Sequence, residues 1–522
     1  MPELAEGDRF AGQEPALHVG KRTARSRTIV ERSMTATIDR EPKDLREESG
    51  RQTDRERALA LGLVIAIGVV SLVVQFLFIP RDWPTSWDEA VYLSQVTPDM
   101  DGLFFNAWHA RGITLLVAPV TWLGGSVSDV RLFLMVLSAI TITLTFRLWI
   151  PVIGIAAALA AFIFSFSWQG LIPASEIKPN YWGALLGLAT AGLIARRLED
   201  DRTGDLVLAS IVLAAMALVR PTEATVLAGA VGAYILLFRR MSWRDLFPLG
   251  IGLFLGWLPW IIEMSVRFGG LPGAVRAAGK EHHFGLVPVA ENVLLHLRYT
   301  DGKYGETAIP GAIWWGVLVV MVAVAFARGV TRADRAAAML CAFGALALAA
   351  EYLFFVPALT YRFLLPAYAM ASIPFAIGLV SLLRGTTARR VIGAIVVLLM
   401  IPWTIWQGAV TAEQAPKVNR GAAGPARVGT TIRRLAEGRP CLVLSQRAYP
   451  QVAYAAGCSG GPAKFRLLTA ERLENLSRSG RAVFVVRIRE VPEDSALGSI
   501  EPVPALAAFS SWYVYEIPPT LD

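Results

Sequence analysis

Two adjacent carboxylic acids, Asp88 and Glu89, follow directly on the first long apolar run of the chain, residues 58–79. A run of that length spans a bilayer as a helix, so both carboxylates are expected to emerge at the membrane surface. A carboxylate placed there could take a proton from a hydroxyl group that attacks a lipid-borne substrate. The competing interpretation is that the acidic pair only decorates a solvated loop, and these two residues alone do not decide between the two.

The composition indicates a membrane protein, because 54% of the residues are hydrophobic. About 20 apolar residues are needed for each helix that crosses the hydrocarbon core. On this basis the sequence predicts an all-α polytopic membrane protein of about eleven transmembrane helices, near residues 58–79, 128–149, 151–168, 181–196, 205–219, 222–238, 247–265, 312–327, 336–356, 363–383 and 391–409. A further apolar stretch at 112–124 is short and is read as a re-entrant or interfacial helix.

Basic residues in alternate short loops predict the orientation of these helices. In the eleven-helix arrangement they fall on one side, together with the basic tail 1–57, which has the composition of a disordered cytoplasmic segment. The net charge of +8 reflects these loops and gives no indication of nucleic-acid binding. Asp88 then faces outward, as do the loops near 80–111, 169–180 and 266–311 and the chain after 410. The arginines that set the orientation are Arg147, Arg196, Arg197, Arg202, Arg239, Arg240, Arg244, Arg328, Arg332, Arg335, Arg384, Arg389 and Arg390.

Residues 411–522 differ in character from the predicted transmembrane domain, 58–410. Their apolar segments shorten to strand length, at 441–444, 482–486 and 512–515, with helix-like segments between them. This pattern predicts a small extracytoplasmic α/β domain. Cys441 and Cys458 both lie in it, and a disulfide between them is plausible in an oxidising compartment. Cys341 is read as a packing residue of a helix.

Several polar side chains share the predicted outer face with Asp88, at one depth. A carboxylate among them could act as a base, and an arginine could hold a phosphate through two parallel charge-assisted bonds. Simple ion pairing between helices is the alternative for Arg220, Glu223, Glu263 and Glu351, and interfacial anchoring is the alternative for Tyr361 and Arg362. The candidate substrate-binding residues are Tyr92, His109, Arg111, Lys178, Arg220, Tyr361 and Arg362, and the candidate acids are Asp88, Glu89 and Glu176.

No cofactor is certain from the sequence. Glu281, His282 and His283 form a weak candidate site for a divalent metal, because adjacent histidines point apart in a regular helix or strand. The sequence contains no glycine-rich phosphate loop at a strand-to-helix junction and no Gly-x-Ser-x-Gly element. Nucleotide-driven transport and serine hydrolysis are therefore unsupported.

The order of these motifs resembles that of the GT-C glycosyltransferases, membrane enzymes that use polyprenyl-phosphate sugars. The chain is similar to bacterial relatives of the protein O-mannosyltransferases and to the aminoarabinose transferases of lipid A. The resemblance covers about 58–410 and the soluble tail domain. It is carried by Trp87-Asp88-Glu89-Ala90-Val91-Tyr92, His109-Ala110-Arg111-Gly112, Arg131, Glu176, Arg220-Pro221 and Tyr361-Arg362-Phe363-Leu364-Leu365-Pro366-Ala367-Tyr368.

The resemblance implies a role for each part of the site. Asp88 is the base or key acid, with Glu89 as its companion, and Glu176 helps to bind the acceptor or the sugar. The donor phosphate is held by Tyr92, Arg111 and Arg362. One departure weakens the assignment of Arg111, because many relatives have a lysine and a proline pair where this chain has residues 109–112.

Together these features predict an integral membrane glycosyltransferase. It moves a sugar from a polyprenyl-phosphate donor to an extracytoplasmic acceptor, which is a cell-envelope glycan, lipid or protein, with inversion if the reaction is a single displacement. The alternative is a transporter or flippase of lipid-linked glycans. A transporter more often has polar residues at mid-membrane and matching broken helices in its two halves, which this sequence lacks.

The orientation can be tested by labelling single cysteines from outside intact cells. We expect residues near 300 and near 500 to react, because the arginine-rich loops place both outside. Protection of both positions until the cells are lysed would contradict the arrangement.

Overall fold

The computed structural model describes residues 43–106, 109–200, 202–238, 243–281, 287–300, 308–329, 331–356, 360–463, 469–478, 480–488, 500, 502–503 and 512–518. The chain divides into two compact units, Met1–Glu56 and Arg57–Asp522. Apart from the first residues of helix α2 (Lys43–Phe78), all the features discussed below belong to the second unit.

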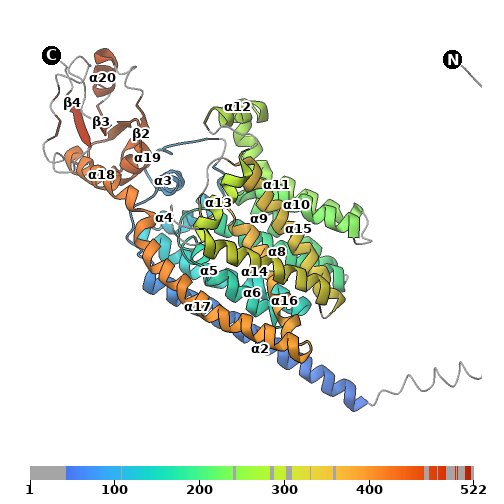
Figure 1. The fold of residues 1–522 in the computed structure, drawn as a ribbon. Coiled ribbons are helices and arrows are strands. Elements are labelled where there is room, and N and C mark those ends of the chain that lie inside the picture. The colour runs from blue at the N-terminus through green and yellow to red at the C-terminus, as the bar shows by residue number, and fades with distance from the viewer. Residues whose placement is uncertain are drawn as a thin grey trace, which may run out of the picture. The chain divides into compact units, whose positions relative to one another are not determined.

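Long apolar helices make up most of this unit (Figure 1). Eight helices of the described residues are long and apolar enough to cross a membrane. They are α2 (Lys43–Phe78), α5 (Val127–Ile153), α10 (Pro221–Phe238), α11 (Trp243–Phe268), α14 (Ile309–Arg328), α15 (Arg332–Phe355), α16 (Leu365–Leu383) and α17 (Thr387–Val418).

The other three predicted spans coincide with helices that are short or enclosed. They are α6 (Ala156–Ser165), α8 (Asn180–Asp200) and α9 (Thr203–Val219). α6 is short because α5 continues through Pro151 and ends at Gly154, whose φ of 56° breaks the helix. A helix thus lies at each of the eleven predicted places, while the number that cross the membrane stays a prediction.

Small residues let the helices pack closely. α8 lies inside the bundle, in contact with α5, α9 and α16, and its residues 180–185 and 187–195 are buried. α11 approaches α9 through Gly252 and Gly256, where an added Cβ would lie 2.2 Å from the carbonyl oxygens of Ser210 and Ala214. This Gly-xxx-Gly spacing is typical of helix contacts in membranes.

Short helices and loops gather at one end of the bundle, near the sheet (Figure 1). α3 (Trp87–Ser94) begins after Ser86, whose backbone N–H donates to Glu89 Oε2 at 2.8 Å, as in one half of a capping box. α4 (Gly112–Trp122), the segment read as re-entrant or interfacial, has 11 residues and is too short to span a bilayer. The remaining helices of this part are α7 (Trp168–Leu171), α12 (Leu271–Glu281) and α13 (Val289–Thr300).

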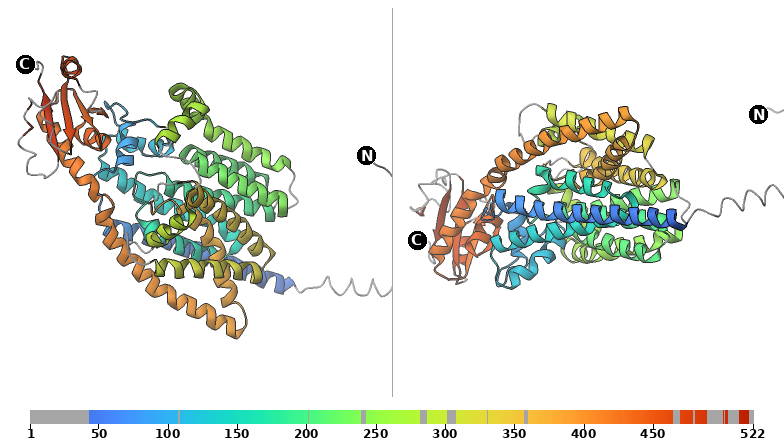
Figure 2. Two further views of the ribbon diagram at one scale, coloured as in Figure 1. Left: turned by 45° about the horizontal axis from the view of Figure 1, so that its top comes forward. Right: turned by 90° about the horizontal axis from the view of Figure 1, so that it is seen from below.

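α17 runs from the far end of the bundle to a small α/β region (Figures 1 and 2). Its four strands have the order β2-β1-β3-β4, with β1 parallel to β2 and β3, and β4 antiparallel to β3. The predicted small α/β sheet is confirmed. Its elements are η1 (Arg420–Ala422), α18 (Ala423–Ala436), β1 (Cys441–Ser445), α19 (Tyr449–Ala456), β2 (Ser459–Pro462), α20 (Ala470–Ser477), β3 (Ala482–Arg487) and β4 (Tyr513–Ile517).

Alternate residues of β3 pack on opposite faces of the sheet. Phe484 and Val486 join the cluster with α18 and α19, whereas Val483 and Val485 join the cluster with α20. A central strand buried on both faces explains the continuous apolar run at 482–486. The predicted boundary at residue 410 falls inside the continuous helix α17, so the division at that residue stays a prediction.

The sheet region contacts the segment that follows α3. Leu103 belongs to the buried cluster of the sheet, and Ser459 Oγ donates to Asp101 Oδ2 at 2.7 Å. α19 also packs against α3 itself. The segment is tied back to α3 because Gln95 Nε2 donates to the carbonyl oxygen of Phe104 at 3.1 Å. The sheet therefore supports the helix that carries Asp88.

Cys441 and Cys458 form a disulfide with a Cα–Cα separation of 4.9 Å, which confirms the pairing considered from the sequence. Cys341 is a buried free thiol in α15.

A thiol-reactive reagent of high mass should add once to the denatured protein without reductant, at Cys341, and three times after reduction. The Cys441→Ser/Cys458→Ser variant should lose about 2–4 kcal/mol of stability in the sheet region, because its unfolded chain is less constrained. Pulse proteolysis in urea measures this loss. Three additions before reduction would contradict the disulfide.

Candidate active site

Asp88 lies at the end of the bundle next to the sheet, in the first turn of α3. Its carboxylate meets two cationic or potentially cationic side chains. Arg362 Nη2 is 2.7 Å from Asp88 Oδ2, and His109 Nε2 is 3.4 Å from Oδ1. About a quarter of the Asp88 side chain remains exposed, so a substrate group can still reach it.

The charge of Asp88 is strongly stabilised. Burial by itself raises the pKa of this carboxyl group, but the hydrogen bond to His109 and the charges of Arg362, His109 and Lys178 outweigh burial. The net effect holds the pKa of Asp88 well below its usual range. Asp88 is therefore a carboxylate throughout the physiological pH range.

Arg362 is held in place on a second side by Asn180, whose Oδ1 accepts from its Nε at 3.2 Å. Asn180 is the first residue of α8, and Arg362 precedes α16. The side chain is mostly buried, with 13% exposed. Two segments far apart in the sequence thus fix one guanidinium group against Asp88.

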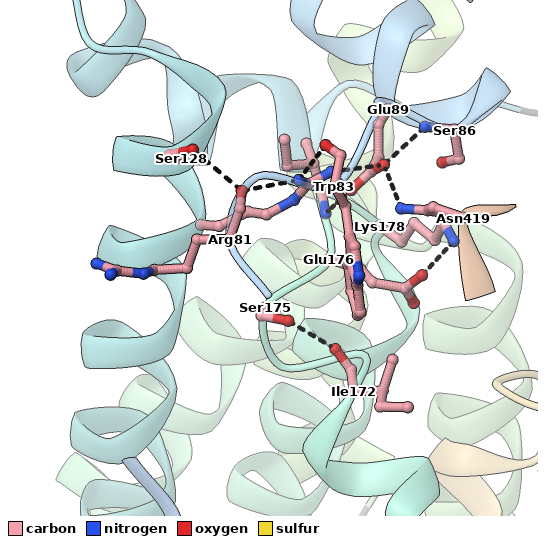
Figure 3. Close-up of polar contacts among 12 residues, drawn as sticks. Arg81, Trp83, Ser86, Glu89, Ser128, Ile172, Ser175, Glu176, Lys178 and Asn419 are labelled. Carbon is pink, nitrogen blue, oxygen red and sulfur yellow. Dashed lines mark hydrogen bonds and ion pairs between the residues drawn. The ribbon is translucent and has the colours of Figure 1, made fainter. Parts of the chain in front are cut away.

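Glu176 lies near this pair in the loop before α8 and is fully buried. Its carboxylate accepts from the ammonium group of Lys178 (Figure 3) and from the Tyr361 hydroxyl at 2.8 Å. The Tyr361 ring stacks on Trp168 with centroids 4.8 Å apart. Glu176, Lys178, Tyr361 and Arg362, four of the candidates chosen from the sequence, are therefore brought together beside Asp88.

Glu89, next to Asp88 in the chain, has a different environment, because it is completely buried. Arg131 Nη2 lies 3.2 Å and 3.3 Å from its two oxygens. Further donors are the backbone N–H groups of Ser86 at 2.8 Å and Ile177 at 3.3 Å, and Asn419 Nδ2 at 3.3 Å. Burial raises the pKa of Glu89, but Arg131, Lys178 and these N–H groups lower it to about 2.

Arg131 is equally buried, and its Nη1 donates to the backbone oxygens of Arg81 at 3.0 Å and Trp83 at 2.5 Å (Figure 3). The pair of Glu89 and Arg131 thus ties together the chain before α3, α5, the loop before α8 and the end of α17. Because Glu89 has no exposed surface, the structure favours a positioning role for it over contact with substrate.

Tyr92 stands one helical turn after Asp88 and is buried. Its ring lies 5.3 Å from the ring of His109. Burial, and next the negative charge of Asp88, raise the pKa of Tyr92 far above 10, while the charges of Arg220 and Arg362 act in the opposite direction. Tyr92 is therefore a neutral hydroxyl group.

Arg111 is held elsewhere. Its Nε donates to Glu263 Oε2 at 2.8 Å, and Arg267 Nε lies 3.0 Å from the other oxygen of Glu263. The guanidinium groups of Arg111 and Arg267 lie 4.5 Å and 3.6 Å from the centre of the Phe105 ring. Within the described residues the ion-pair partner of Arg111 is Glu263. An open groove of about 640 Å³ is lined here by Arg111, Pro259, Ile262, Glu263, Val266 and Arg267.

Arg220 belongs to a third group. Its Nε donates to Glu223 Oε1 at 2.8 Å, and the Tyr352 hydroxyl contacts both side chains. Glu223 is fully buried. These contacts of Arg220 fit the alternative raised from the sequence, which is ion pairing between helices.

The structure does not test the candidate metal site. Glu281 is the last residue of α12, and His282 and His283 lie outside the described residues. Among the residues that the structure places, no cluster of three or more metal-ligating side chains occurs.

Sequence reasoning missed two residues that shape the site. Asn419 reaches Glu89 from a position 330 residues later, and nothing in its local sequence distinguishes it. Asn106 contacts His109 from three residues before it. Arg131 was noted only as part of the resemblance, although a charge at the start of an apolar span is itself a signal of a buried partner.

No protein-family model matches the chain, and no curated protein matches it in sequence. Solved structures do match. A crystal structure of ArnT from Cupriavidus metallidurans bound to undecaprenyl phosphate has a TM-score of 0.62 and 13% sequence identity, and the match covers 87% of this chain and 98% of that one.

The crystal structure of the same ArnT in the apo state also has a TM-score of 0.62 and 13% identity, over 88% of this chain and 99% of that one. The chain is therefore a polytopic helical membrane protein with the fold of ArnT. The GT-C-like fold implied by the sequence resemblance is confirmed.

Removing one partner of the Glu89–Arg131 pair should destabilise the protein. We expect Glu89→Gln or Arg131→Met to cost about 3–5 kcal/mol, because either change leaves a buried charge unpaired. The double change Glu89→Leu/Arg131→Met should cost less than the sum of the two. Thermal unfolding in detergent measures these effects, with Asp82→Asn as a control at an exposed acid of the same segment.

The pH dependence of this contribution has a definite sign. The folded-state pKa of Glu89, about 2, lies below its ordinary value of 4.5. The contribution is therefore complete above about pH 4.5 and is lost as the pH falls towards 2. Equal stability of Glu89→Gln and the wild-type protein at pH 7 would contradict the assignment.

Proposed function

We propose that this protein is an integral membrane glycosyltransferase that moves a sugar from a polyprenyl-phosphate donor to an extracytoplasmic acceptor. One observation carries the proposal: the partly exposed carboxylate Asp88 lies among fixed cations at one end of a helical bundle with the ArnT fold. The ArnT structure that contains undecaprenyl phosphate supports a lipid-linked donor.

In the proposed reaction a hydroxyl oxygen of the acceptor attacks the anomeric carbon, and Asp88 takes the hydroxyl proton. A bond forms between that oxygen and the anomeric carbon, while the bond from this carbon to the phosphate oxygen breaks. The electron pair leaves with the polyprenyl phosphate. A single displacement of this kind inverts the configuration of the sugar.

The leaving phosphate carries negative charge, which nearby cations stabilise more strongly as it develops. We assign this role to Arg362, Lys178 and Arg111. Arg362 is paired with Asp88, so a phosphate that binds Arg362 shares it with that carboxylate. Arg111 lies on the open groove, whose walls include the apolar residues Pro259, Ile262 and Val266, an environment suited to a lipid next to its phosphate.

Glu176, Tyr92 and His109 complete the proposed site. Glu176 is buried between Lys178 and Tyr361 and sets the position of both side chains, through which it acts on the sugar or the acceptor.

The predicted orientation places this end of the bundle and the sheet outside the cytoplasm. A disulfide in the sheet agrees with an oxidising compartment.

Replacing the proposed base should abolish most activity without unfolding the protein. Asp88→Asn keeps the size of the side chain and removes its basicity. We expect the transfer rate to fall by about two orders of magnitude or more, the usual scale for loss of a general base. The rate is measured as release of undecaprenyl phosphate from a panel of undecaprenyl-phosphate-linked hexoses and pentoses, with an extract of the cell envelope as acceptor.

Asp82→Asn provides the matched control, since Asp82 is an exposed aspartate six positions earlier and should leave the rate unchanged. An Asp88→Asn protein that transfers sugar at the wild-type rate would exclude Asp88 as the base. If the wild-type protein moves labelled donor across a vesicle membrane and releases no undecaprenyl phosphate, it is a flippase and the proposal is wrong.

A further inference from the structure

Glu263 binds Arg111 in the geometry that a phosphate would use. The Nε and Nη2 atoms of Arg111 donate to the two carboxylate oxygens of Glu263, and the Nε contact measures 2.8 Å. Two parallel charge-assisted bonds of this kind are also how a guanidinium group binds a phosphate. This edge of Arg111 therefore cannot hold Glu263 and a phosphate at the same time.

Glu263 has a second cationic partner, which lies on its own helix. Arg267 stands one turn further along α11, and its Nε is 3.0 Å from Glu263 Oε1. The Glu263 side chain is only 13% exposed, so it needs a cation beside it. If Arg111 moves away, Arg267 still supplies that cation. The contact between Arg111 and Glu263 can therefore open without leaving the acid unpaired.

Arg111 also has contacts that do not depend on Glu263. Its guanidinium carbon lies 4.5 Å from the centre of the Phe105 ring, a cation–π contact that persists if the carboxylate is exchanged for another anion. Arg111 is also the N-cap residue of α4, so its backbone is held at the start of that helix. Because its side chain lines the open groove, Arg111 can change partner by a side-chain movement alone.

The charge on the lipid phosphate changes during the proposed reaction. In the donor the phosphate is a diester of the sugar and the polyprenol, with one negative charge. The polyprenyl phosphate that leaves is a monoester, which carries about 1.5–2 negative charges near pH 7. Glu263 equals the diester in charge, and it loses no translational freedom when it binds Arg111. The monoester can therefore displace Glu263 from Arg111, and the diester cannot.

We propose that Glu263 is an internal competitor of the lipid phosphate for Arg111. The inference rests on the proposed function. Arg111 stays on Glu263 while the donor binds. It moves to the phosphate as the bond to the anomeric carbon breaks and the electron pair passes to the phosphate oxygen, and it returns to Glu263 when polyprenyl phosphate departs. Arg111 thus stabilises the transition state and not the donor, which is the condition for an interaction to raise turnover.

The exchange can be tested by binding alone, with two probes. One is undecaprenyl phosphate, a monoester, and the other is its methyl ester, a diester with one charge and no sugar to transfer. Native mass spectrometry of the purified protein measures the binding of both. Arg111→Ala should weaken binding of the monoester about tenfold or more, because charge-assisted bonds are lost, and binding of the diester by less than about threefold. Equal weakening of both probes would overturn the exchange.

Glu263→Gln removes the charge of the competitor and keeps its size. This variant should bind both probes about tenfold more tightly than the wild-type protein, because Arg111 is then available to each. A merely structural Glu263 predicts lower thermal stability without any gain in binding, and that result would contradict the proposal. Glu291→Gln is the matched control, since Glu291 is an exposed glutamate in the first turn of α13. If Glu263→Gln does not fold, the comparison of the two probes in Arg111→Ala still decides.

Turnover with the same donor panel separates this inference from the proposed function. Glu263→Gln should have a lower KM for the donor, stronger inhibition by added undecaprenyl phosphate and a lower kcat, because the product then leaves slowly. A wild-type protein that releases undecaprenyl phosphate, together with a Glu263→Gln protein of unchanged KM and product inhibition, overturns the exchange alone. A wild-type protein that releases none from any donor overturns the proposed function and the exchange with it.

Discussion

The buried ion pair of Glu89 and Arg131 is the constraint on which the site depends. Neither side chain has any exposed surface. Two charges in such a place are tolerated when they pair with each other and hydrogen bonds satisfy most of their remaining donors and acceptors. The pair collects such partners from distant segments of the chain, from Arg81 to Asn419. The start of α3 can therefore take only one position relative to α5 and the loop before α8.

This constraint explains how two adjacent carboxylates come to differ. Successive residues of a helix point about 100° apart, since a turn contains 3.6 residues. Because Glu89 points into the protein to meet Arg131, Asp88 must point towards Arg362 and His109. One acid is thus sealed and structural, and the other stays reachable. The ion pair that fixes the position of Glu89 therefore also determines the direction of the Asp88 side chain.

A considerable part of this arrangement could be predicted from the sequence. Apolar runs marked the helices, and short apolar runs marked β1, β3 and β4, because both patterns follow directly from burial. Asp88, Glu176, Tyr361 and Arg362 could be grouped because they end or precede helices on one predicted face. The sequence alone could not predict that Glu89 would be buried in an ion pair, since that depends on Arg131 lying opposite it.

The contacts that sequence reasoning did not foresee depend on how irregular segments fold. Arg111 was expected near Asp88, but the segment after α3 folds so that Arg111 meets Glu263 and shares the Phe105 ring with Arg267. No periodic pattern encodes such a path. Asn419 is a similar case, because its partner is set by where α17 ends and not by its neighbours in the sequence.

The contact between Asn419 and Glu89 also has a consequence for biogenesis. The two residues are 330 positions apart, and a ribosome adds about 5–20 residues per second. Between the translation of Glu89 and that of Asn419, on the order of 15–70 seconds therefore pass. During this interval the acid lacks one of its hydrogen-bond donors. The nascent protein thus carries a polar centre that gains its full set of partners only when α17 and the residue after it have been made.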